Sequence, residues 1–174
     1  MIKRIALILV VLVVAIVAFA ATKPDDFHVQ RTATINAPPD KIVALIHDFR
    51  EWSAWSPFEK LDSEMVRTYS GANSGEGAVY EWEGNSQAGA GRMEIIESSP
   101  SKVEIALDFN RPFETHNIAE FTLQPSGAST DVTWAMHGPN LFIGKVMSVF
   151  ISMDNMVGPE FETGMQNLKA LAEK

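Results

Sequence analysis

Ionisable side chains alternate with aromatic ones along a strand-like stretch near the middle of the chain. Glu81 and Glu83 alternate with Tyr80 and Trp82, so both carboxylates would lie on one face of a strand. Paired carboxylates can act as general acid and base where an apolar cavity raises their pKa. We favour a solvent-exposed face, and an inward-facing one is the alternative. In that alternative, the candidate polar groups of a cavity are Glu81, Glu83, Arg92, Glu94, His116 and Glu120.

Motifs that would give these groups a catalytic role do not occur in the sequence. The chain has no Cys, and its four His residues lack the spacing of a metal site. The glycines at 75, 77, 89 and 91 lack the strand-to-helix context of a phosphate loop, and sheet bulges explain them better. No GxSxG motif is present. We therefore expect neither a metal nor a cofactor.

Length and charge limit the remaining possibilities. The chain has 174 residues, enough for one domain with a core and too few to expect two. Its net charge of −8 argues against nucleic acid, because binding to phosphates requires clustered Lys and Arg. Nucleic-acid binding is therefore set aside.

The N-terminal segment is uniformly apolar from Ile5 to Ala21. This run would span roughly 25 Å as a helix, at the low end for a membrane span. A cleaved signal peptide is the alternative, supported by the small residues Ala18 and Ala20 around Phe19. We favour an uncleaved anchor over residues 1–22, followed by a linker over 23–26 and a domain over 27–174.

Charges around the apolar run predict how it would be oriented in a membrane. Lys3 and Arg4 precede it, and Asp25 and Asp26 follow it. The positive-inside rule therefore predicts a cytoplasmic N-terminus and a domain on the extracytoplasmic, periplasmic side. Signal cleavage would place the domain on the same side, as a secreted or periplasmic protein.

The domain itself begins with a strand and a helix. Residues 27–36 alternate between apolar and polar side chains, the pattern of a half-buried strand. Pro38, Pro39 and Asp40 suit the first turn of a helix, which continues with apolar residues at helical spacing to Phe49. Six further strands are predicted, over residues 64–70, 77–84, 89–98, 102–109, 115–124 and 129–137.

The last third of the sequence changes to helical spacing. Apolar residues recur densely from Leu141 until Gly158 and Pro159 interrupt the pattern. A terminal helix is predicted from Pro159, with Glu160 in its first turn and Lys169 near its end, which complements the helix dipole. Strands joined by short turns and covered by helices predict an α+β fold with an antiparallel sheet.

Several sequence blocks resemble the START-like, helix-grip superfamily known as SRPBCC, and within it bacterial proteins of the polyketide cyclase/dehydrase-like group. The matching blocks are INAPPDKI, WSAWSPFEK, YSGANSGEGAVYEWEGN, AGAGRMEIIESSPSKVEIALDF, DVTWAMHG and GPEFETGMQNLK. Together they extend over nearly all of the chain from residue 27. The resemblance implies a curved antiparallel sheet of about seven strands wrapped on a long C-terminal helix. It also implies a cavity between them that commonly holds a hydrophobic ligand.

The resemblance places the tryptophan-rich segment DFREWSAWSPFEK beside that cavity. Trp52, Trp55 and Phe58 would then line its mouth, or they would only seal the end of the core. Methionines in the last strand and helices suit a deformable pocket or an ordinary core. The expected lining residues are Trp52, Trp55, Phe58, Trp82, Phe109, Phe121, Trp134, Met136, Phe150, Met153, Val157, Phe161 and Met165.

Three functions remain open, and binding is the one we favour. The first is a membrane-tethered domain that holds a lipid or another hydrophobic small molecule. The second is an enzyme, a cyclase or dehydratase acting on a polyketide-like substrate, although no catalytic residue of that family can be matched here. The third is a protein-interaction or chaperone-related module. Convergent ionisable residues inside the cavity would distinguish the enzyme from the binding domain.

Overall fold

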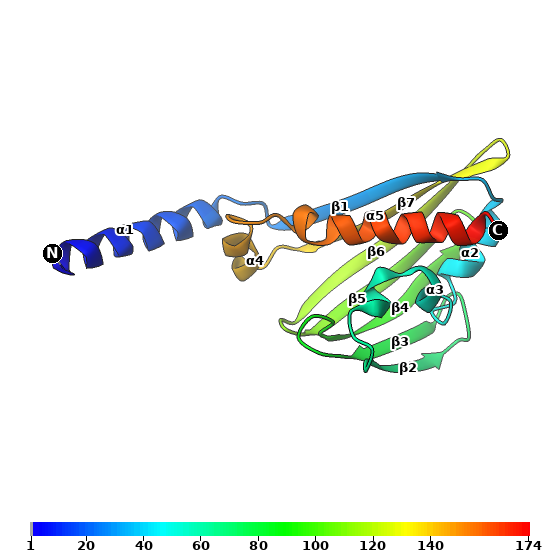
Figure 1. Cartoon of the computed structure of the whole chain (residues 1–174), viewed down its shortest axis with the longest axis horizontal. Helices are drawn as coiled ribbons and strands as arrows, with labels where there is room; N and C mark the ends of the chain where they lie inside the picture. Colours follow the sequence, from blue (N-terminus) through cyan, green and yellow to red (C-terminus); the bar gives the residue numbers. More distant parts are fainter. Residues whose placement is uncertain (1) are drawn as a thin grey trace.

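A computed structural model describes residues 2–174 as an apolar helix followed by an α+β domain (Figure 1). The strands are β1 (Asp26–Ile35), β2 (Val66–Gly71), β3 (Ala78–Glu83), β4 (Ala90–Ser99), β5 (Lys102–Arg111), β6 (Thr115–Ser126) and β7 (Ser129–Pro139). The helices are α1 (Ile2–Ala21), α2 (Pro39–Ile46), α3 (Trp52–Trp55), the 3-10 helix η1 (Pro57–Lys60), α4 (Phe142–Met147) and α5 (Met153–Ala172).

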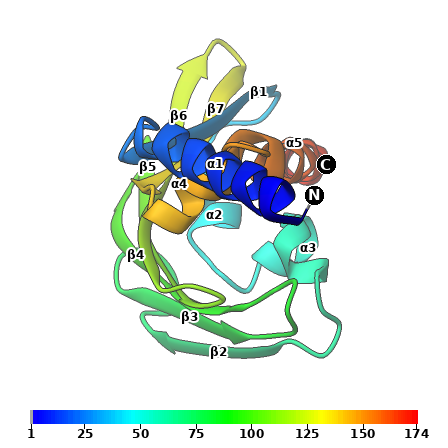
Figure 2. The ribbon, with the colours of Figure 1, turned by 90° about the vertical axis from the view of Figure 1, so that its left-hand side faces the viewer.

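The strands form one antiparallel sheet in the order β1-β7-β6-β5-β4-β3-β2. Strands β2 to β7 follow one another as hairpins, and β1 joins the far edge by pairing with β7. The pairing of β4 with β5 shifts register between Ala90 and Gly91, where Asn110 of β5 is left out of the pairing as the extra residue of a β-bulge. Figure 2 shows the sheet curving around α2, α3 and α5, which lie on its concave side. The predicted seven-stranded helix-grip architecture is confirmed.

Helix α5 lies on the concave face and differs from the predicted terminal helix at its start. It begins at Met153, capped by Ser152 Oγ, which accepts a hydrogen bond from the Asn155 backbone N–H. Pro159 therefore lies inside α5 and does not begin it. The stretch from Leu141 contains a separate short helix, α4, and a break before α5. The cap at Ser152 starts the helix six residues earlier than the proline signal indicated.

An arginine from the sheet holds the first half of α5. The Arg31 side chain on β1 reaches Asp154 Oδ1 at 2.7 Å and Glu162 Oε1 at 2.8 Å. Both carboxylates lie on α5 on either side of Gly158, and the guanidinium lies against that glycine. These carboxylates raise the pKa of Arg31, which stays charged.

The segment 52–61 closes the concave side through α3 and η1. Glu59 of η1 is buried and accepts hydrogen bonds from Tyr80 Oη on β3 at 2.6 Å and from Arg67 Nε on β2 at 2.7 Å. Burial and the bond to Glu59 raise the pKa of Tyr80, so its hydroxyl remains protonated. Glu59 therefore attaches η1 to the edge of the sheet.

Helix α1 projects away from the domain, as Figure 1 shows. It has 20 residues, long and apolar enough to cross a membrane, and in α1 only Ala20 is buried. The length and composition suit either a membrane span or a signal sequence. The hydrophobic core within residues 2–174 runs from Val29 to Ala172 and includes no residue of α1. The domain is therefore expected to fold without α1.

Two glycines of α5 provide a test of how tightly the helix lies on the sheet. A Cβ at Gly164 would lie 2.7 Å from Trp134 Cζ3 and 3.1 Å from Pro57 Cδ, which are parts of rigid rings. At Gly158 it would collide with the Arg31 guanidinium, the end of a flexible side chain whose ion-pair partners Asp154 and Glu162 are more than half exposed, so that displacing it costs little. Both Gly→Ala changes gain the same helix propensity, so that term cancels in their comparison. We expect G164A to be less stable than G158A by about 1–3 kcal/mol because it overpacks a rigid contact. Urea unfolding of both variants measures this difference, and equal stabilities would contradict the close packing.

Removing the charge of Glu59 should loosen the closing segment. We expect E59Q to lower the free energy of unfolding by about 1.5–3 kcal/mol, because the charged hydrogen bond from Arg67 is lost. Glu64→Gln removes the same charge from an exposed position in the following loop and serves as the control. Chemical denaturation of both variants checks the prediction, which fails if the two lose equal stability.

Candidate functional site

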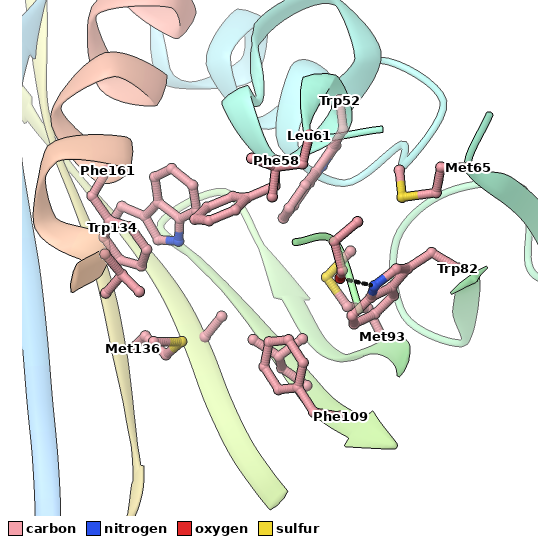
Figure 3. Close-up of a pocket in the computed structure, with 14 residues that line it drawn as sticks. Trp52, Phe58, Leu61, Met65, Trp82, Met93, Phe109, Trp134, Met136 and Phe161 are labelled. Atoms are coloured by element: carbon pink, nitrogen blue, oxygen red, sulfur yellow. Dashed lines mark hydrogen bonds between the residues drawn. The ribbon is translucent and has the colours of Figure 1, made fainter. Parts of the chain in front are cut away.

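A cavity of about 120 Å³ lies between the sheet, α5 and the closing segment 52–61. Every side chain in its wall is aliphatic, aromatic or a thioether, as Figure 3 shows. The wall consists of Trp52, Phe58, Leu61, Met65, Trp82, Ala88, Met93, Leu107, Phe109, Ala119, Trp134, Met136, Val157 and Phe161. The arrangement can hold an apolar group away from water.

A packed aromatic cluster forms one side of the cavity. The Trp134 ring on β7 stacks on Phe161 of α5 with centroids 4.1 Å apart and an angle of 10° between the planes. The edge of Phe58 meets Trp134 at 6.1 Å, and Trp52 meets it at 6.4 Å. Trp134 therefore joins the helix, the sheet and the closing segment at one place.

Gly91 makes room for the opposite wall. A Cβ at this position on β4 would collide with the Trp82 ring and with the Asp108 carbonyl oxygen. Trp82 lies across the strand pair and meets Phe109 edge to face at 5.5 Å. The absence of a side chain at Gly91 thus leaves room for the Trp82 ring in the cavity wall.

The cavity lies toward one end of the sheet. Its wall includes Ala88 in the turn between β3 and β4, Phe109 near the end of β5, and Met136 near the end of β7. The antiparallel register puts these positions at the same end as Asp26, where β1 begins after α1. The cavity and the apolar helix α1 thus lie toward the same end of the domain.

Eight of the residues expected from the sequence lie together in this wall. They are Trp52, Phe58, Trp82, Phe109, Trp134, Met136, Val157 and Phe161. Six more lining residues were missed, namely Leu61, Met65, Ala88, Met93, Leu107 and Ala119. Met93, Leu107 and Ala119 share the inward periodicity of the predicted strands, a signal that could have found them.

The other five expected residues lie elsewhere. Trp55, Phe121 and Met165 are buried in the core behind the cavity, where they seal the packing between helix and sheet. Met153 packs against the core from the first turn of α5 without entering the wall. Phe150 does not line the cavity at all, because it lies in the break between α4 and α5 with 74% of its surface exposed.

The candidate polar groups all lie outside the cavity. Glu81 is exposed on the face of β3 opposite Tyr80 and Trp82. Arg92 pairs with Glu94 at 2.7 Å, and Glu120 lies 3.4 Å from Lys102. The interpretation of this face as solvated, which we favoured, agrees with these positions.

His116 is also exposed, on the outer face of β6 beside Asp108 of β5. Its Nδ1 lies 2.8 Å from Asp108 Oδ1, and this hydrogen bond raises the pKa of His116. The ring is therefore a surface partner of Asp108 and not a group of the cavity.

The indole N–H groups around the cavity differ in whether they have a hydrogen-bond partner. Trp52 donates its N–H to the Ile46 carbonyl at 2.8 Å, and Trp82 donates to the Ala88 carbonyl at 3.0 Å. Trp134 Nε1 is buried and has no hydrogen-bond partner within residues 2–174. In the same part of the chain, no cluster of His, Asp or Glu could hold a metal ion.

Solved structures share this fold at low sequence identity. Protein CV1439 from Chromobacterium violaceum is 15% identical with a TM-score of 0.57, and the match covers 87% of this chain and 99% of that one. Protein MLL2253 from Mesorhizobium loti is 15% identical with a TM-score of 0.58, covering 83% and 96%. Protein Ms6760 from Mycobacterium smegmatis is 19% identical with a TM-score of 0.56, covering 83% and 89%. At these identities the likeness concerns the fold alone.

Sequence comparison defines the family. No curated protein matches the sequence of this chain. A family model described as "Polyketide cyclase / dehydrase and lipid transport" matches residues 26–173, which include every strand of the sheet and all of α5. The chain therefore belongs to the polyketide cyclase/dehydrase and lipid transport family.

Proposed function

We propose that this protein is a membrane-anchored binding domain that holds a hydrophobic molecule between its sheet and α5. The observation that carries the proposal is the wall of the cavity, in which all 14 side chains are aliphatic, aromatic or thioether groups. Burial of apolar surface provides the driving force for binding in such a site. The family description, which includes lipid transport, agrees with a ligand of this class.

The cavity volume limits what can enter. An engineered cavity of about 150 Å³ in another protein binds benzene. The cavity here, about 120 Å³, therefore suits one ring or the end of a chain. A lipid would insert only part of itself unless the closing segment moved outward.

Exposed apolar residues at the same end of the domain support contact with a bilayer. Helix α4 contacts α1, and Figure 2 shows the two helices side by side in the view along α1. Phe142 on α4 and Phe150 just after it are exposed by 54% and 74%. Because α4 adjoins the apolar helix, we propose that this surface lies in the membrane interface. The cavity would then be close to the lipids from which an apolar ligand partitions.

The orientation of the anchor is also part of the proposal. Lys3 and Arg4 precede the apolar run of α1, so the N-terminus would remain cytoplasmic and the domain over 27–174 would be extracytoplasmic. The short linker over 23–26 would keep that domain at the membrane surface.

A cyclase or dehydratase is the second candidate, because the family description includes these activities. Such an enzyme needs acid or base groups within reach of the substrate. Within residues 2–174, none of the cavity-lining side chains is ionisable, and the carboxylates of β3 and β4 point to the outer face. This observation favours binding over catalysis.

Filling the cavity tests the binding proposal directly. Ala119 lines it from β6, whereas Ala106 on the neighbouring strand β5 faces outward with Glu94 and Ile118. We expect the wild type to bind toluene and Ala119→Met to weaken that binding at least about tenfold by occupying the space. Ala106→Met is the matched control and should bind as the wild type does. Calorimetric titration measures all three, and a wild type that does not bind toluene would refute the proposal.

Membrane contact can be tested separately on residues 23–174, which keep the whole hydrophobic core. We expect this fragment to float with phosphatidylcholine vesicles and the double change F142S and F150S to abolish most of the flotation. Ile96→Ser removes an exposed apolar side chain from the sheet, away from α4, and should have little effect. A fragment that ignores vesicles while Phe142 and Phe150 remain exposed would argue for a protein partner at α4.

A further inference from the structure

We propose that the ligand of the cavity carries a hydrogen-bond acceptor oxygen, such as a carbonyl or ether oxygen, that receives the N–H of Trp134. This inference rests on the proposed binding function and specifies the chemistry of the ligand. It excludes a plain hydrocarbon chain as the preferred occupant. The carrying observation is a buried donor that the rest of the described chain leaves without a partner.

Trp134 is unusual among the tryptophans of this protein. The indole N–H groups of Trp52, Trp55 and Trp82 each donate to a backbone carbonyl, at 2.8, 3.0 and 3.0 Å. Trp134 is 3% exposed, so water outside the protein does not satisfy its N–H. A buried donor without a partner costs free energy, which is why such groups are rare. A partner supplied by a ligand would remove this cost.

The direction of the donor agrees with this role. Figure 3 shows the indole nitrogen of Trp134 on the side of the ring that faces the space above Met136, away from α5. The six-membered ring of Trp134 lies against Gly164 through Cζ3, and Phe161 stacks on the face of the indole, so these two residues fix its orientation. Ser56 Oγ and Asn117 Oδ1 are also buried without partners, but neither residue lines the cavity. Trp134 is thus the unsatisfied donor that a ligand in the cavity can reach.

A trapped water molecule is a poorer partner than a ligand oxygen. A buried water usually requires two to four polar partners. The wall side chains other than tryptophan offer no N–H or O–H group, and the N–H groups of Trp52 and Trp82 are already donated to backbone carbonyls. A water at this place would have one good hydrogen bond and would lose its others. An oxygen on a hydrocarbon body needs only the one bond and fills the remaining space with apolar atoms.

Two probes of equal shape separate the acceptor from the hydrocarbon body. Cyclohexanone and methylenecyclohexane differ only in whether an oxygen or a CH₂ group is doubly bonded to the ring. One hydrogen bond changes affinity by roughly three- to tenfold. We therefore expect Trp134→Phe to lower the affinity for cyclohexanone about three- to tenfold more than it lowers the affinity for methylenecyclohexane. The hydration free energy of a free probe is the same whichever protein it binds. It therefore cancels when the affinities of one probe for wild type and variant are compared.

Trp82→Phe is the matched control. It shortens another ring in the same wall, but its N–H already has a partner in the Ala88 carbonyl. This change should weaken both probes by the same factor. If Trp134→Phe also affects both probes equally, the acceptor is not recognised by Trp134 and the inference is wrong.

A spectroscopic measurement keeps the test valid if Trp134→Phe does not fold. In residues 23–174 labelled with ¹⁵N-tryptophan, the indole signals can be assigned with the Trp52, Trp55 and Trp82 variants. Cyclohexanone should move the Trp134 indole proton downfield, and methylenecyclohexane should not. If methylenecyclohexane binds while cyclohexanone leaves that proton unmoved, the inference fails and the binding function stands. If neither probe binds, both are refuted.

Discussion

The contact between Trp134 and Phe161 is the interaction on which the rest of the domain depends. A sheet with one apolar face must be covered, and α5, which lies along β1, covers the concave side together with α2, α3 and η1. The two rings stack at 4.1 Å, and Gly164 lets the helix approach the Trp134 ring closely. Trp52 and Phe58 then pack edge to face against the same indole, which places the closing segment. The distance from sheet to helix is therefore set by aromatic rings.

This packing also explains why a cavity remains. Rings are rigid and prefer edge-to-face or offset arrangements, so they cannot fill the irregular space between a curved sheet and a straight helix. The cluster fills one part of that space completely, where Trp55 and Phe121 are fully buried. Toward the other end of the sheet, Trp82, Phe109 and Met136 leave a space between them. The aromatic cluster that stabilises the domain and the wall of the proposed binding cavity thus share side chains, and Trp134 belongs to both.

The antiparallel register then decides where this space lies relative to α1. Strand β7 ends and strand β1 begins at the same end of the sheet, so α4 and α1 emerge beside each other. The turn after β3 and the end of β5, which contribute Ala88 and Phe109 to the cavity wall, lie at that end as well. An apolar helix, an apolar surface and an apolar cavity are consequently close together, and the proposed binding at a bilayer rests on this arrangement.

The sequence by itself determined the class of the protein and much of its fold. Alternation predicted the strands, the apolar run predicted α1, and the matching blocks from INAPPDKI to GPEFETGMQNLK indicated the helix-grip architecture. These features are local, because periodicity and capping depend on neighbours in the chain. The start of α5 was wrongly predicted because Pro159 carried a start signal that the Ser152 cap overrides.

Only the tertiary structure decided which aromatic residues line the cavity. Trp52 and Trp55 lie three positions apart in one segment, yet the first borders the cavity and the second is sealed behind it. Phe150 fits a helical pattern and still lies on the surface, because α4 ends before it. Trp134 and Trp82 are equally good donors in sequence, and only the position of the Ala88 carbonyl distinguishes them. Such differences arise from contacts between segments distant in the chain, which periodicity does not encode.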